Sequence, residues 1–302
     1  MKHFKKLRAA AILLCSLTLL SVLPACNSFS DTEYAVVSEG NISADGFIFD
    51  KYENSTVRIT GLDSSPRTLE IPEEIEGMPV VEIAECAFEN NDKLLYLKLP
   101  KGNIKLGKRF CSGCVALMVV DLSGSVTALP ASAFEGCVNL SVVYGMSSVT
   151  EIGDQVFADC TSLASFKTPA DLQSIGAESF RGCTSLASIE LPETLTSIGE
   201  SAFWGCSSLA VAIINGNASL PRYAFLNCIS LSEIVLGDNV EAIGEEAFRG
   251  CSALYTFRAG KNFKTVADYA FHGCDKLTEI RFAGDTGKIT VGDGNEALGI
   301  SK

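Results

Sequence analysis

Histidine is almost absent from this chain of 302 residues, which contains only His3 and His272. A Ser-His or Cys-His catalytic pair would depend on His272, and no local motif fixes an Asp or Glu beside it. The glycines form neither a P-loop nor a dinucleotide-binding loop. Asp285, Asp293 and Glu296 could bind calcium only loosely, because the EF-hand spacing is absent. The sequence therefore predicts a protein that is not an enzyme and has no metal and no cofactor.

Basic residues are also scarce, since 24 Lys and Arg stand against 36 Asp and Glu, which gives a net charge of −12. Four of the basic residues lie within residues 1–8. Phosphate binding needs a basic surface, so nucleic acid is excluded as a partner. The single long apolar run, "AAILLCSLTLLSVLPA", is too short to cross a membrane comfortably.

The N-terminus has the layout of a secretory signal peptide, because the basic segment "MKHFKKLR" precedes the apolar run. Residues 23–26, "LPAC", resemble the bacterial lipobox. That resemblance implies that residues 1–25 are removed and that Cys26 becomes a lipidated N-terminus anchored in a membrane. Several acyl chains on Cys26 would make the attachment stable. The alternatives are a plain signal peptide cut elsewhere and an uncleaved anchor.

Phenylalanine recurs at intervals of 22 to 24 residues and marks an internal repeat. The repeating phenylalanines are Phe88, Phe110, Phe134, Phe157, Phe180, Phe203, Phe225, Phe248 and Phe271. A cysteine follows closely in every unit but the first, at Cys114, Cys137, Cys160, Cys183, Cys206, Cys228, Cys251 and Cys274. A unit of about 23 residues cannot close its own core, whereas stacked units bury one another's inward side chains. The repeat therefore predicts a solenoid.

The unit at residues 186–206, "LASIELPETLTSIGESAFWGC", shows what each position does. Ile189 and Leu191 share the inward face of a short strand, because side chains alternate along a strand. Pro192 ends that strand, since it has no N–H. Phe203 points into the core, and the phenylalanine at this position is the largest side chain of each layer. We predict a right-handed stack of about nine units, mostly β and loop with short helical turns, in which successive strands form a parallel sheet.

The pattern "LxxIxLPxxLxxIGxxAFxGC" resembles the BspA-like class of bacterial leucine-rich repeat proteins, and the resemblance covers residues 69–300. Residues 163–183, 186–206 and 231–251 fit best. Residues 140–157 and 209–225 depart from the pattern, which indicates a kink, a binding surface or simple drift. The resemblance implies an exported surface protein that recognises a protein or glycan.

The chain divides into four segments on this interpretation. Residues 1–25 are the signal peptide and the polar residues 26–42 a tether. Residues 43–67 form a β-hairpin cap and residues 68–302 the solenoid. The C-terminal "VGDGNEALGIS" resembles the repeat with two extra residues. We expect it to begin a tenth layer.

The repeat cysteines are predicted to be a ladder of buried free thiols. Equivalent residues in adjacent layers stand about 4.8 Å apart with parallel Cβ vectors, which does not suit a disulfide. A left-handed turn residue is expected just before each of these cysteines, with Asn90 and Ser112 in that slot in the first two units. Cys111 is assigned to the variable slot after Phe110, so that its CxxC motif with Cys114 is a coincidence. Cys86 is interpreted in the same way.

Two surface features are candidates for binding. Outward strand positions carry apolar side chains, and Trp204 follows Phe203 in a variable slot, with Arg181 and Leu226 in the same slot of adjacent units. The alternative is that Trp204 folds over Leu226 and shields its own neighbour. The candidate residues are Trp204, Arg181, Leu226, Tyr96, Tyr144, Val142, Ile213 and Val235.

These observations predict a lipid-anchored extracellular protein that acts as a recognition or adhesion module for a protein or glycan. The alternative is a structural, envelope-organising lipoprotein that associates with its own copies through the repeat surface. An ordered oligomer at micromolar concentration would favour the second function.

Overall fold

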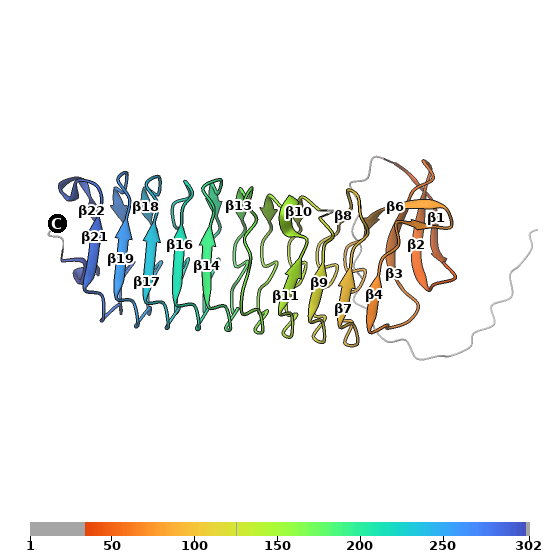
Figure 1. The fold of residues 1–302 in the computed structure, drawn as a ribbon, viewed down its shortest axis with the longest axis horizontal. Coiled ribbons are helices and arrows are strands. Elements are labelled where there is room, and N and C mark those ends of the chain that lie inside the picture. The colour runs from red at the N-terminus through yellow and green to blue at the C-terminus, as the bar shows by residue number, and fades with distance from the viewer. Residues whose placement is uncertain (1–33, 125, 300–302) are drawn as a thin grey trace, which may run out of the picture.

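The computed structural model describes residues 34–124 and 126–299, and it confirms the solenoid (Figure 1). Successive turns of the chain stack along one long axis, with the N-terminal cap at one end and the last turn at the other. The signal peptide, Cys26 and residues 27–33 of the tether lie outside the described residues.

The N-terminal cap is a small antiparallel sheet that continues into the solenoid. β2 (Phe47–Tyr52) and β3 (Val57–Leu62) pair as a hairpin, and β1 (Val36–Ile42) adds a third strand beside β2. Residues 36–42 were assigned to the tether from their polarity, but their backbone pairs with β2. β3 pairs in parallel with β6 (Met78–Ile83), which joins the cap to the first turns. β5 (Glu74–Ile75) pairs with β6 antiparallel.

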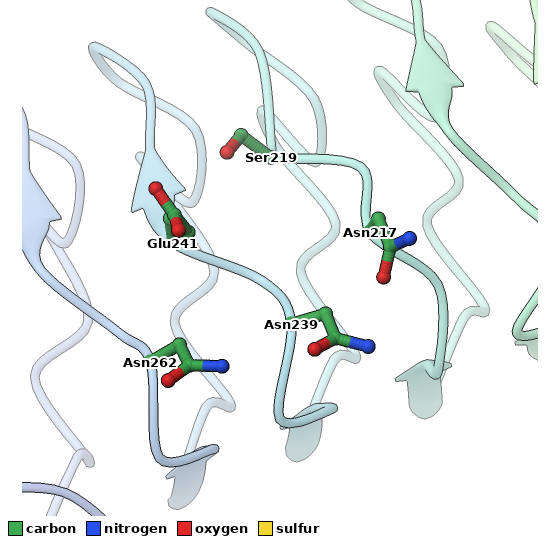
Figure 2. Close-up of a pocket in the computed structure, with 5 residues that line it drawn as sticks. All are labelled: Asn217, Ser219, Asn239, Glu241 and Asn262. Atoms are coloured by element: carbon green, nitrogen blue, oxygen red, sulfur yellow. The ribbon is translucent and has the colours of Figure 1, made fainter.

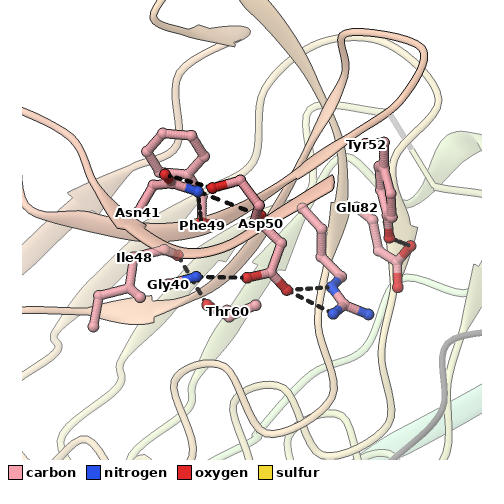
Figure 3. A network of polar contacts seen from close by, with 10 residues as sticks. Gly40, Asn41, Ile48, Phe49, Asp50, Tyr52, Thr60 and Glu82 are labelled. Atoms are coloured by element: carbon pink, nitrogen blue, oxygen red, sulfur yellow. Dashed lines mark hydrogen bonds and ion pairs between the residues drawn. The ribbon is translucent and has the colours of Figure 1, made fainter. Parts of the chain in front are cut away.

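Asp50 is the centre of a buried polar network in this cap (Figure 3). Its Oδ1 accepts the Gly40 N–H over 2.9 Å, and its Oδ2 accepts Nη2 of Arg58 over 2.6 Å. The hydroxyl of Tyr52 donates to Oε2 of buried Glu82 over 2.9 Å. Burial alone would lower the pKa of Arg58, but the hydrogen bond to Asp50 and the nearby negative groups raise it overall. The network ties β1, β2, β3 and β6 together.

The strand face consists of two parallel sheets. The first is ordered β11-β9-β7-β4 and the second β14-β16-β17-β19-β21. The first contains β4 (Thr68–Glu70), β7 (Tyr96–Lys98), β9 (Val119–Asp121) and β11 (Val142–Tyr144). The second contains β14 (Ser188–Leu191), β16 (Val211–Ile214), β17 (Glu233–Leu236), β19 (Thr256–Ala259) and β21 (Glu279–Phe282).

The predicted parallel pairing of successive strands is interrupted once on this face, because residues 164–168 form no strand between β11 and β14. Residues 163–183 were expected to be among the most regular units. Thr168 stands where Leu191 is found one unit later, and its buried hydroxyl has no hydrogen-bond partner among the described residues. Phe166 stands where Ile189 is found, and its ring packs edge-on against Phe180 with centroids 4.9 Å apart. Phe257 occupies the slot of Phe166 in β19, which pairs on both sides, so the ring alone does not explain the interruption. Thr168 places a polar hydroxyl where the strands of the second sheet have an apolar residue.

A second face of short strands runs parallel to the first. Its sheets are ordered β10-β12-β13-β15 and β18-β20-β22, while β8 (Lys105–Leu106) pairs with β6. The short strands are β10 (Ala128–Leu129), β12 (Glu151–Ile152), β13 (Ser174–Ile175), β15 (Ser197–Ile198), β18 (Ala242–Ile243), β20 (Thr265–Val266) and β22 (Thr290–Val291). Between β15 and β18 the face is reduced to one bridge, Leu220 to Ile243.

The core is a column of phenylalanine rings between the two faces. Phe203 and Phe225 stack with centroids 5.0 Å apart and ring planes at 6°, and other layers repeat this arrangement. Phe110 and Phe134 are the exception, with ring planes at 70°. The hydrogen-bond register explains the difference. The N–H of Phe134 donates to Val156 O, the residue before Phe157 of the next unit. The N–H of Cys111 makes the equivalent bond to Ala133 O, the residue before Phe134. Cys111 therefore occupies the core slot of its unit, and Phe110 lies in the slot before it.

The turn layer that follows each short strand contains two left-handed residues per unit. One precedes the cysteine, as predicted, for example Gly205 with φ 73°. In the unit of Cys114 this residue is Gly113 and not Ser112, because Cys111 shifts the unit by one position. The other left-handed residue, for example Ser201 with φ 58°, was not predicted, because its slot holds many residue types. Its N–H donates to the next unit, as Ser201 does to Arg222 O over 3.1 Å.

The last described turn ends in short 3₁₀ segments, with a third such segment earlier in the chain. These segments are η1 (Met146–Ser148), η2 (Thr286–Lys288) and η3 (Glu296–Leu298). The expected tenth layer is present as β22 and η3. Buried Asn295 precedes η3, and its side chain accepts the Phe271 N–H and donates to Ala267 O.

Candidate functional site

The outward strand positions lie in register, but they form two surfaces. Tyr96, Val119 and Val142 are neighbours across β7, β9 and β11, and all are half-buried. Tyr144, at the end of β11, is 59% exposed. Because residues 164–168 interrupt the sheet, this group is separated from the candidates on β16 and β17.

Ile213 and Val235 are adjacent in the second sheet, where β16 and β17 pair in parallel. Their outward neighbours along the sheet are Glu190 on β14 and Arg258 on β19. Arg258 forms an ion pair with Glu233 over 3.0 Å, so the apolar pair is bordered by charge. The two residues are half-buried and form a small apolar surface.

Trp204 lies in the turn after β15 and is 40% exposed. Its backbone is fixed, because its N–H donates to Ser201 O over 3.0 Å and its carbonyl accepts the Gly182 N–H over 2.8 Å. A groove of about 590 Å³ opens beside the indole. The groove is lined by Glu200, Ser201, Trp204, Tyr223, Leu226, Asn227, Glu246 and Arg249.

The structure brings Trp204 and half-buried Leu226 to the same groove but leaves Arg181 outside its lining. Arg181 instead forms ion pairs with Asp159 over 3.0 Å and with Glu178 over 2.9 Å. The combination of Trp204, Arg181 and Leu226 expected from one repeat slot is therefore incomplete.

Tyr223 and Arg249 line the groove and were not among the predicted residues. Tyr223 comes from the left-handed slot two residues before Phe225, with φ 60°, and that slot was not recognised from the sequence. Arg249 stands in the slot of Trp204 two units later. Its guanidinium forms an ion pair with Glu246 over 2.6 Å, and this hydrogen bond raises the pKa of Arg249. The groove is thus lined by two aromatic side chains and by the ion pair of Arg249 and Glu246.

A second groove, of about 380 Å³, lies at the corner between the two strand faces (Figure 2). It is lined by Asn217, Ser219, Asn239, Glu241 and Asn262. No residue of this lining belongs to the Trp204 groove, and all five are exposed.

Comparison with known proteins identifies the repeat. The model of the BspA type leucine rich repeat region, which contains six copies, matches residues 67–183 and 150–278. This chain belongs to the BspA-type leucine-rich repeat family. No curated protein matches the sequence.

The BspA-type chain is similar to several solved structures. A leucine rich repeat protein of T. pallidum is 27% identical over 71% of this chain and 90% of that chain, with a TM-score of 0.49. A leucine rich cell surface protein of Faecalibacterium prausnitzii is 17% identical over 86% and 97%, with a TM-score of 0.47. A leucine-rich repeat protein of Bacteroides ovatus is 21% identical over 85% and 93%, with a TM-score of 0.40.

The repeat cysteines of the BspA-type chain are buried free thiols, which confirms the predicted ladder. Each Sγ donates to a backbone carbonyl one unit back, as Cys206 does to Phe180 O over 3.1 Å. Cys137 donates to Cys111 O over 3.2 Å, in agreement with Cys111 in the core slot. Cys111 is itself free and fully buried, so its assignment to a variable surface slot is wrong. Cys86 lies in the left-handed slot two residues before Phe88, with φ 57°, and is not part of the ladder.

No cluster of three or more His, Cys, Asp or Glu side chains suited to a metal occurs in residues 34–124 and 126–299. His272 is exposed and lies against the ring of Tyr269, with centroids 6.0 Å apart. Over the same residues, no helix is long and apolar enough to cross a membrane.

Proposed function

We propose that this protein is a lipid-anchored extracellular recognition module that binds a partner protein through the Trp204 groove. The groove carries the proposal, because it combines Trp204, Tyr223 and Arg249 around half-buried Leu226. Trp, Tyr and Arg are the residues that most often dominate binding energy at protein interfaces. An indole can supply a large contact area at low cost in side-chain entropy.

The scaffold supports recognition because it fixes the groove before a partner arrives. Main-chain hydrogen bonds hold residues 201, 204 and 205 against the adjacent units. The Phe203 and Phe225 rings stack beneath the same turns. Binding to a preformed surface avoids the entropic cost of ordering a loop. Repeat folds commonly use extended surfaces formed by several stacked units for binding.

The lipid anchor is the second part of the proposal. It is supported by the basic N-terminal segment, the short apolar run and the "LPAC" sequence that ends at Cys26. Cells that express the Cys26→Ala variant in the presence of a labelled fatty acid should produce unlabelled protein. A Cys26→Ala protein that is still labelled would exclude Cys26 as the lipidation site.

The groove is tested by affinity capture with residues 27–302, followed by measurement of binding between the purified partner and each variant. Trp204→Ala should weaken binding at least tenfold, as expected for a residue of a binding hot spot. Tyr255→Ala is the matched control, because Tyr255 is 50% exposed and does not line the groove. Equal binding by Trp204→Ala and the wild type would refute the groove as the site.

The oligomeric state tests the alternative function. Sedimentation of residues 27–302 at micromolar concentration should show a monomer. An ordered oligomer that Trp204→Ala does not disrupt would instead support an envelope-organising protein that associates through its repeat surface.

A further inference from the structure

The groove in Figure 2 lies where one unit of the solenoid is shorter than its neighbours. Ile214 pairs with Leu236, and Leu220 pairs with Ile243. The segment from Ile214 to Leu220 is therefore one residue shorter than the equivalent segment from Leu236 to Ile243. The short strand of this unit is correspondingly reduced to a single bridge. The departure of residues 209–225 from the repeat pattern therefore includes a deletion of one residue, and the groove lies beside it.

Three amide side chains form a row along this hollow. The strands β16, β17 and β19 pair in register, and each is followed at the same distance by an asparagine. These residues are Asn217, Asn239 and Asn262. Equivalent residues in adjacent turns are about 4.8 Å apart. Figure 2 shows the amides side by side on three turns, with Ser219 and Glu241 in a neighbouring row.

The three amides have unused hydrogen-bonding capacity. All are exposed, and their side chains make no hydrogen bond to any residue within 34–124 and 126–299. By contrast, Asn215 in the same loop donates to Glu190 and Asn295 donates to backbone carbonyls. Each free amide offers two N–H donors and one carbonyl acceptor.

The groove carries little net charge, although the protein is acidic. Glu241 forms an ion pair with Lys264 over 2.7 Å, and Asp238 forms one with Lys261 over 2.8 Å. The hydrogen bond from Lys261 also lowers the pKa of Asp238, which keeps that carboxylate ionised and paired. A strongly anionic or cationic ligand would therefore find no unpaired opposite charge here.

We propose that the row of Asn217, Asn239 and Asn262 binds a neutral oligosaccharide. A hydroxyl group donates and accepts hydrogen bonds, and an amide offers the complementary groups in one planar unit. Amides repeated on three turns match a chain that repeats its hydroxyls. The groove is shallow and polar, with no apolar pocket for the anchoring side chain of a protein partner. It is separate from the Trp204 groove and does not depend on it.

The test measures binding of residues 27–302 to neutral hexasaccharides of glucose, mannose and N-acetylglucosamine, with chondroitin sulfate as the anionic comparison. We expect one neutral series to bind and Asn239→Ala to weaken it at least tenfold. Asn239→Gln should retain part of the affinity, because it keeps an amide. Ser148→Ala is the matched control, since Ser148 is exposed at the equivalent corner of another unit.

Three results would overturn the proposal. These are no binding to any neutral hexasaccharide, preference for chondroitin sulfate, and unchanged affinity in Asn239→Ala. Thermal unfolding of each variant separates loss of binding from loss of folding. Asn239→Ala should also keep the affinity for the protein partner that Trp204→Ala loses, so that the two sites can fail independently.

Discussion

The backbone N–H of Phe271 donates to Oδ1 of Asn295 over 3.0 Å. In the unit before, the Phe248 N–H donates to the backbone carbonyl of Ala270 over 2.8 Å. In the last described layer, the buried side chain of Asn295 therefore supplies the hydrogen-bond acceptor that a backbone carbonyl of the next unit supplies elsewhere. Asn295 also donates to Ala267 O over 2.9 Å, which fixes its orientation.

Asn295→Ala should lower the free energy of unfolding by about 2 kcal/mol, because it leaves the buried Phe271 N–H without an acceptor. Asn295→Asp keeps the acceptor, but it places a buried carboxylate oxygen against the carbonyls of Ala267, Gly292 and Asp293, which now receive N–H donors, so its loss should be larger. Chemical denaturation measures both variants, and hydrogen exchange should locate the effect at residues 265–298. A smaller loss in Asn295→Asp than in Asn295→Ala would show instead that Asn295 acts mainly as the acceptor for the Phe271 N–H.

The sequence predicted the stacked units, the inward phenylalanines and the thiol ladder, because these depend on side chains that recur in every unit. It did not predict the position of Cys111. Phe110 imitates the repeat phenylalanine, and only the hydrogen-bond register shows the shift of one residue. The left-handed slot of Ser201 and Tyr223 was also missed, since its backbone geometry is imposed by bonds to the next unit.

The candidate sites were predicted less completely, because each depends on neighbours from different slots. Trp204 and Leu226 line the same groove, but Arg181 forms ion pairs with Glu178 and Asp159. Tyr223 completes the groove from a slot whose side-chain direction depends on a left-handed backbone. The interruption at residues 164–168 was also missed, because only the strand pairing shows that this unit, with Thr168 in place of an inward leucine, forms no strand.

Substitution of two repeat glycines by alanine should reduce stability by different amounts and for different physical reasons. A Cβ on Gly199 would lie 2.2 Å from the backbone N of Ala177 in the adjacent unit. A Cβ on Gly205 would have its nearest neighbour at 4.0 Å, but Gly205 has a φ of 73°. Gly205→Ala should therefore cost about 1 kcal/mol for the left-handed backbone. Gly199→Ala should cost about 3 kcal/mol or more, because the two units must separate.

Thermal and chemical unfolding of the two glycine variants measure this order. If Gly205→Ala were the more destabilising, the backbone conformation would matter more than the close approach between units, contrary to our expectation.

The thiol ladder predicts a loss of stability at alkaline pH. Burial raises the pKa of Cys274 to about 12 from an ordinary value of 9.0, and it raises the pKa of Cys160 and Cys251 as well. Above pH 9 the unfolded chain loses these protons while the folded chain keeps them. The stability contributed by the protonated thiols is therefore complete below about pH 9 and is lost as the pH rises toward 12.

The free energy of unfolding, measured from pH 7 to pH 11, should show no loss from these thiols up to about pH 9. Above pH 9 it should fall by about 1.4 kcal/mol per pH unit for each thiol that differs between the two states. Cys274→Ala should reduce this slope by the contribution of one thiol, about 1.4 kcal/mol per pH unit. It also lowers stability at pH 7, because it removes buried volume. An unchanged slope in Cys274→Ala would mean that other groups cause the alkaline loss.

Thr168 is a position where the natural residue reduces stability. Its buried hydroxyl has no hydrogen-bond partner among the described residues, and leucine stands at the equivalent Leu191. Thr168→Val keeps the shape of the side chain and removes the unsatisfied hydroxyl, so it should raise the free energy of unfolding by about 1 to 2 kcal/mol.

Thr194→Val is the matched control, because the Thr194 hydroxyl donates over 2.8 Å to Ala170 O and Leu172 O. The same chemical change should therefore lower stability there, by about 1 kcal/mol. Opposite signs in the two variants, measured by urea denaturation, would establish that the hydroxyl at residue 168 weakens the interrupted part of the sheet. Destabilisation by Thr168→Val would instead show that this hydroxyl makes a favourable interaction in solution, for instance with water that reaches the gap between β11 and β14.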